Sequence, residues 1–233
     1  MTDLIIGMGD DTDQFRHGAF LRSIARLNIN AEVQIFTHDP LPWHPVVDRW
    51  KLIADYIQKG EYCRVIACDT FDVVFQTNPF DRTDWVGRHL MVVSEERLFK
   101  DCEGNKRGML QSFPQFYEKL ENEEILNAGV IAGTGPEVAK LCEDIYNLCQ
   151  QDVRLPVFTP GFEDRLPDQQ ALNILYERQR HCVLHGTDAF AFQYNHKHSF
   201  RDGRCYNENG ELYAILHQYV WQHKDEVQRL YGT

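Results

Sequence analysis

Residues 62–75, YCRVIACDTFDVVF, decide the fold of this chain. The largely apolar run from Tyr62 to Cys68 is typical of a buried β-strand, and it ends at two acidic residues, Asp69 and Asp72. Two carboxylates three positions apart, where a strand runs out into a turn, can face one point in space, and such hard oxygen ligands suit Mg²⁺ or Mn²⁺. The alternative interpretation is that Asp69 caps a turn while Asp72 is solvated.

The segments before this stretch alternate between strand-like and helix-like patterns. The expected strands and helices are Leu4–Ile6, Gln14–Leu27, Ala31–Thr37 and Val46–Gln58, the second helix being stopped by Gly60. An order of strand, helix, strand, helix, strand is that of parallel strands joined by crossover helices. The first half therefore predicts a parallel α/β sheet.

The second half has a less regular pattern. We expect strands at Leu90–Ser94, at Ile125–Ala132 and, in short form, near Cys182 and Ile215. The expected helices are Gln115–Glu123, Pro136–Gln150 and Asp168–Tyr176, whereas Asp101–Arg107 is predicted to be a polar excursion. With no repeat, low-complexity segment or linker, the simplest fold is one α/β domain over residues 1–233, with a mostly parallel central sheet flanked by helices.

Composition excludes several classes of protein. The 233 residues include 24 Lys and Arg against 35 Asp and Glu, a formal net charge of −11 that repels phosphate backbones, so nucleic acid is not an expected partner. No apolar run is long enough to span a membrane, and the amino terminus lacks the basic segment of a signal peptide. Seven cysteines without a C-x-x-C spacing indicate reduced thiols, so we expect a cytoplasmic protein.

Residues 62–80, YCRVIACDTFDVVFQTNPF, resemble the metal-binding strand of GT-A glycosyltransferases, which move a sugar from a nucleotide diphosphate donor. The D-x-x-D form followed by two aliphatic residues and Phe75 is similar to the glycosyltransferase domains of lysyl hydroxylases and to related viral and bacterial transferases. The more usual motif of the superfamily is D-x-D, so this is a variant. The resemblance implies a single GT-A, Rossmann-like domain.

Three further segments follow in the order that the resemblance implies. Residues 94–95 (SE) resemble an acceptor-side turn, residues 126–130 (LNAGV) the L-N-[SA]-G motif, and residues 166–173 (LPDQQALN) the D-Q-x-x-L-N helix start. In this family the aspartate and glutamine of the last motif bind sugar hydroxyls or lie beside the reacting carbon. Donor binding is thereby assigned to Gly7, Met8, Gly9, Lys51, Asp69, Asn127, Ala128, Gly129, Asp168 and Gln169.

The metal ligands implied by the resemblance are Asp69, Asp72 and a histidine late in the chain. His217 is favoured because it follows the last predicted strand, and His185 is a competing candidate that comes soon after the aspartate–glutamine helix. Two carboxylates and a neutral imidazole suit Mn²⁺, or Mg²⁺.

The function implied is metal-dependent transfer of a sugar from a nucleotide-sugar donor, expected to be UDP-linked, to a glycan, glycoprotein or other hydroxyl acceptor. If the reaction inverts the anomeric centre, Asp168 or Asp164 is the candidate base; if it retains configuration, no such base is required. The alternative outside enzymology is a catalytically inactive GT-A-like module that binds carbohydrate or acts as a scaffold. A haloacid-dehalogenase-like phosphatase would need an aspartate at position 71, where the chain has Phe71.

Overall fold

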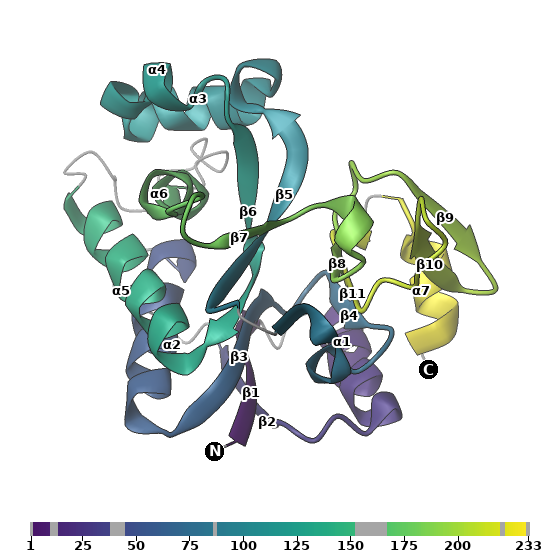
Figure 1. The fold of residues 1–233 in the computed structure, drawn as a ribbon. Coiled ribbons are helices and arrows are strands. Elements are labelled where there is room, and N and C mark those ends of the chain that lie inside the picture. The colour runs from purple at the N-terminus through teal and green to yellow at the C-terminus, as the bar shows by residue number, and fades with distance from the viewer. Residues whose placement is uncertain are drawn as a thin grey trace.

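The computed structural model describes residues 2–9, 14–37, 45–85, 88–151, 167–219 and 222–231. At its centre lies a six-stranded sheet with the order β2-β1-β3-β6-β5-β7 (Figure 1). These strands are β1 (Thr2–Gly9), β2 (Glu32–Thr37), β3 (Tyr62–Asp69), β5 (Leu90–Leu98), β6 (Glu124–Thr134) and β7 (Cys182–Leu184). The chain is therefore an α/β protein.

The sheet is mixed. Strand β1 pairs in parallel with β2 and β3 through the crossover helices α1 (Gln14–Leu27) and α2 (Pro45–Lys59), which confirms the parallel arrangement predicted for the first half. Strands β5 and β7 are also parallel, but β6 is antiparallel to both of its neighbours. The connection from β5 to β6 returns to the sheet at the end where β5 leaves it, so β6 must run in the opposite direction. Three of the five strand pairings are thus parallel, and the two antiparallel ones both involve β6.

Side chains alternate between two cores on the two faces of the sheet. Along β3, Val65 and Ala67 pack with α2, α5 (Gly135–Gln151) and α6 (Pro167–Leu175). Ile66 and Cys68 point the other way, towards a core that contains Phe20 of α1. This period of two is the geometry of a β-strand buried on both faces, and it accounts for the continuous apolar runs of the sequence. Figure 1 shows α2, α5 and α6 on one side of the sheet and α1 on the other.

The segment between β5 and β6 differs from its prediction. Instead of a polar excursion at residues 101–107, the chain forms α3 (Glu103–Ser112). The predicted helix at residues 115–123 is reduced to α4 (Tyr117–Leu120) after a short 3₁₀ turn. The first half of α3 is polar, which hides the helix in the sequence. Met109, and Phe113 directly after the helix, are buried in the core beside α6.

A smaller lobe covers the α1 side of the molecule. It contains a three-stranded sheet of β4 (Val73–Phe75), β11 (Ile215–His217) and β8 (Ala191–Phe192), in which β11 lies between the other two. A hairpin of β9 (His198–Arg201) and β10 (Arg204–Asn207) follows, and α7 (Lys224–Tyr231) packs against α1. None of the helices within the described ranges combines the length and the apolar character of a bilayer-spanning segment.

Gln76 connects β4 to the hairpin. Its buried amide donates to the carbonyl oxygens of Cys205 (3.0 Å) and Tyr213 (2.9 Å) and accepts from the Cys205 N–H (2.9 Å). A single side chain thus satisfies backbone groups of two segments more than 100 positions away in the chain. The smaller lobe depends on this polar contact as well as on apolar packing.

Replacing Gln76 with leucine should therefore destabilise the protein. The buried Cys205 N–H and Tyr213 carbonyl would lose their partner, at a cost of roughly 2–4 kcal/mol in the free energy of unfolding. Urea unfolding followed by circular dichroism measures this change. Gln58→Leu, at an exposed position of α2, is the control and should change stability by less than about 0.5 kcal/mol. Equal effects of the two substitutions would contradict the role given to Gln76.

Candidate metal centre

The backbone brings Asp69 and Asp72 together with His217. Asp69 is the last residue of β3, and Asp72 directly precedes β4. Because β4 pairs with β11 in the register Val73↔His217, the histidine lies beside the second aspartate, and the Gln218 N–H donates to the Asp72 carbonyl oxygen at 3.0 Å. The pairing of a three-residue strand thus joins positions that are 145 residues apart in the sequence, counted as 217 − 72.

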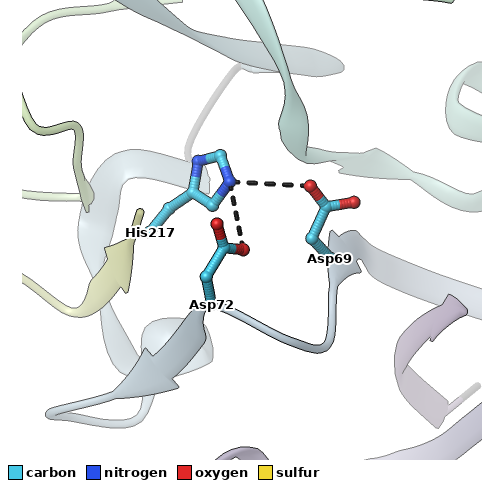
Figure 2. Close-up of side chains that lie close together, drawn as sticks. All are labelled: Asp69, Asp72 and His217. Atoms are coloured by element: carbon cyan, nitrogen blue, oxygen red, sulfur yellow. Dashed lines mark ion pairs between the residues drawn. The ribbon is translucent and has the colours of Figure 1, made fainter. Parts of the chain in front are cut away.

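The three side chains converge on one point (Figure 2). The Nε2 atom of His217 lies 3.6 Å from Asp69 Oδ2 and 3.5 Å from Asp72 Oδ1, and all three ligand atoms lie within 4.8 Å of one another. His217 is only 1% exposed, whereas the aspartates reach solvent. Two carboxylate oxygens and one imidazole nitrogen form a donor set that suits a divalent ion such as Mn²⁺. The structure thus brings His217, and not His185, to the aspartate pair.

Gly129 makes room for the histidine. Val92 pairs with Ile131 but Val93 pairs with Asn127, so residues 128–130 form a bulge of β6. A Cβ atom on Gly129 would lie 2.2 Å from His217 Cε1 and 2.9 Å from Asp69 Oδ2. The resemblance assigns Gly129 to donor binding, whereas in the structure the space at this position is taken by the imidazole of the candidate metal centre.

Gln193 holds the other side of the imidazole. It is fully buried, and its Nε2 lies 2.8 Å from His217 Nδ1, while its Oε1 has no hydrogen-bond partner among the described residues. With its amide turned by 180°, Oε1 accepts the Nδ1–H of the histidine, so Nε2 is the ring nitrogen that faces the two carboxylates. Burial opposes protonation of the ring, but Asp72 and Asp69 raise the pKa of His217, so a metal ion would have to displace the Nε2 proton, while Nδ1 stays protonated as a metal-bound histidine requires. Nothing in the sequence around Gln193 signals this role.

Arg49 supplies the positive charge next to the centre. From α2, its guanidinium pairs with Asp69 through Nη1 and with Asp168 Oδ2 through Nη2 at 2.7 Å. Trp50 Nε1 donates to the same Asp168 oxygen at 3.1 Å. Burial alone would raise the pKa of Asp69, but Arg49 and His217 outweigh this effect and hold that pKa well below its usual range. Asp69 is therefore ionised and ready to bind a cation.

The predicted donor lysine is not part of this cluster. Lys51 forms a surface ion pair with Asp55 one turn along α2, and its side chain is 41% exposed. Residues two apart on a helix face different directions, so Arg49 points to the sheet edge and Lys51 to solvent near α5. The cation of this cluster is instead Arg49 on the same helix, which a 3.6-residue repeat places beside the buried Trp50 and Ile53.

A second polar group lies next to the metal centre. Glu95 is 4% exposed, in a bulge of β5, and its Oε1 accepts hydrogen bonds from Asn127 Nδ2 (2.9 Å) and Gln169 Nε2 (3.1 Å). Burial raises the pKa of Glu95, although both hydrogen bonds oppose this rise. Gln169 also donates to Asn105 Oδ1 of α3 at 2.8 Å and accepts weakly from the Ala128 N–H at 3.4 Å. The predicted residues Asn127, Ala128 and Gln169 thus belong to one buried network.

The remaining predicted residues fall into three cases. Gly7, Met8 and Gly9 form the end of β1, where Met8 pairs in register with Asp69 and its carbonyl accepts from the Thr70 hydroxyl at 2.8 Å, so this segment lies beside the metal centre. The Nδ1 atom of His185 lies 3.5 Å from Glu124 Oε2, and His185 is not among the converging ligands. Asp164 lies outside the described residues.

Comparisons with known proteins do not assign a family. No protein-family model matches the chain, and a search of the curated proteins finds no match either. A function for this chain therefore has to be argued from the chemistry of its residues and the geometry that holds them.

Substituting Gly129 with alanine should weaken metal binding without unfolding the protein. The added methyl group would displace the His217 ring, so we expect a loss of at least about tenfold in Mn²⁺ affinity, measured by calorimetry or by the electron paramagnetic resonance of free Mn²⁺. Gly104→Ala in α3 is the matched control, because a Cβ atom there has no neighbour within 4 Å. An unchanged affinity in Gly129→Ala would remove His217 from the ligand set.

Substituting Arg49 with methionine should lower the stability of the protein. Asp168 would lose its cationic partner, and we expect the free energy of unfolding to fall by about 3 kcal/mol in the presence of chelator. Mn²⁺ should restore part of this loss because it neutralises Asp69, so Mn²⁺ should stabilise the variant more than the wild-type protein. Urea titrations with and without the metal test this difference, and equal stabilisation of both proteins would contradict it.

Proposed function

We propose that this chain is a metal-dependent glycosyltransferase with a single GT-A domain, which uses a nucleotide diphosphate sugar as donor. The observation that carries the proposal is the convergence of Asp69, Asp72 and His217 at the sheet edge where β1 also ends. The buried network of Asn127 and Gln169 lies next to this centre. The D-x-x-D, L-N-[SA]-G and D-Q motifs of the sequence thus meet in space, although they lie up to 100 residues apart.

The metal centre fits a diphosphate leaving group. A divalent ion held by Asp69, Asp72 and His217 would neutralise the negative charge that develops on the nucleotide diphosphate. The acidic chain, with a net charge of −11, needs such an ion to bind an anionic donor. We infer Mn²⁺ as the ion and UDP as the nucleotide, following the resemblance of the D-x-x-D strand.

The network beside the centre is suited to hold a sugar. Glu95, Asn127 and Gln169 offer carboxylate and amide groups whose positions are fixed by one another, and sugar hydroxyls are recognised by such groups. Asp168 is held by Arg49 and Trp50, which favours a role in positioning over that of a mobile base. The acceptor on this proposal is a glycan or glycoprotein hydroxyl. The seven free cysteines fit the cytoplasm as its compartment.

The alternative is a module that has kept the fold but lost the activity. Loss of a metal ligand would be its signature, and all three ligands are present and converge. Thermal-shift and calorimetric binding of UDP, GDP, CDP and their sugar conjugates, with Mn²⁺ or with chelator, separates the two. A Mn²⁺-dependent response to one nucleotide supports the transferase, whereas binding of free oligosaccharides without any nucleotide supports the inactive module.

Asp72→Asn should abolish this nucleotide binding while preserving the fold. Asparagine keeps the size of the side chain but removes its charge, and we expect the Mn²⁺-dependent affinity for UDP to fall by at least about tenfold. Asp55→Asn, which removes a half-exposed carboxylate on α2, is the matched control and should bind as the wild-type protein does. UDP binding that is equally strong in Asp72→Asn would refute the proposed metal role.

A further inference from the structure

Two histidines outside the metal centre point their ring nitrogens at each other. His198 lies at the start of β9 and His223 directly precedes α7, and their Nε2 atoms are 2.7 Å apart. Both side chains are half-buried, so a small ion can reach them from solvent. We propose that this histidine pair is a second metal site, which takes a borderline divalent ion such as Zn²⁺ and differs in ion preference from the aspartate-rich centre.

The protonation pattern of His198 suits a metal ligand. Its Nδ1–H donates to the His196 carbonyl oxygen at 2.7 Å, so its Nε2 carries a lone pair. A hydrogen bond from one ring nitrogen to a backbone carbonyl, with the other nitrogen left to bind, is the usual arrangement of metal-bound histidine. Without an ion, His223 Nε2–H donates to that lone pair. When Zn²⁺ binds, His223 loses this proton to water and takes up a proton at Nδ1, so both Nε2 lone pairs bind the ion and both rings stay neutral.

Aromatic packing holds the two rings in place. Phe192 packs edge-on against His198 with ring centroids 4.9 Å apart, and Phe200 stacks on His223 at 4.5 Å with an interplanar angle of 17°. The ligands are thus positioned before the ion arrives.

The geometry requires only a small adjustment. Two nitrogens bound at about 2.0–2.1 Å to a tetrahedral Zn²⁺ lie roughly 3.3 Å apart, so the pair must open by about 0.6 Å from its hydrogen-bonded distance. His196 is not available as a ligand, because its Nε2 bonds to the Ser94 carbonyl oxygen at 2.8 Å and its Nδ1 accepts from the Gln193 N–H. Water completes the coordination shell.

The bound ion would join two parts of the smaller lobe. β9 belongs to the hairpin, and α7 packs against α1, so a metal between His198 and His223 fixes the hairpin to the last helix. Figure 1 shows α7 beside β9 and β10 and away from β3 and β6. The site is therefore separate from the aspartate centre.

Nitrogen-resolved NMR of the histidine side chains provides the direct test. In chelator-treated wild-type protein, one equivalent of Zn²⁺ should shift the Nε2 resonances of His198 and His223, while His198 Nδ1 stays protonated. The same titration on Asp72→Asn, in which the aspartate centre is damaged, should give the same shifts. Unmoved His198 and His223 resonances, with Zn²⁺ bound elsewhere, would overturn the proposal.

Calorimetry with variants gives a second readout. His198→Ala and His223→Ala should each lose one equivalent of bound Zn²⁺ and the rise in melting temperature that accompanies it, whereas His185→Ala, which removes another half-exposed imidazole, should lose neither. Equal Zn²⁺ stoichiometry in all three variants would contradict the site. If either variant does not fold, the NMR titration of the wild-type protein decides. A failure of Mn²⁺-dependent UDP binding leaves these outcomes unchanged, so the two proposals can fail separately.

Discussion

The structure depends on balancing the acidic side chains that it gathers at one sheet edge. Asp69, Asp72 and Asp168 meet there, and carboxylates removed from water are stable only when they are paired and hydrogen-bonded. Arg49 bridges Asp69 and Asp168, and His217 lies against Asp69 and Asp72. This one arginine also links α2 to the end of β3 and to the start of α6. The same ion pairs therefore balance the charge and hold the helical layer against the sheet.

Irregularities in the sheet make this arrangement possible. The bulge at residues 128–130 of β6 brings Gly129 against His217, and the bulge of β5 turns Glu95 towards Asn127 and Gln169. A regular pair of strands would send alternate side chains to opposite faces and could not direct them to one edge. The glycine therefore serves the histidine of the centre, and the small sheet of β4 and β11 sets the position of that histidine.

The aspartate centre and the pair of His198 and His223 differ in their donor atoms and in their place in the fold. The aspartate centre combines hard oxygen donors with one imidazole and lies beside a network suited to hydroxyl groups, and the proposed transferase activity rests on these two features. The histidine pair has nitrogen donors only and lies where the last helix meets a hairpin. The first site carries the proposed chemistry, and the second would stabilise the lobe that holds His217 in place.

The sequence by itself determined most of the elements and the candidate ligands. Apolar runs and their periods located β1–β3, β6, α1, α2 and α5 closely, and the D-x-x-D strand with His217 named the three side chains that converge. Local patterns report burial and turn chemistry, which depend on near neighbours in the chain. Tertiary structure alone decided the antiparallel direction of β6, the helix α3, and the roles of Arg49 and Gln193. These depend on contacts between residues far apart in sequence, where a polar residue inside a helix or beside a strand looks the same whether it faces solvent or a buried charge.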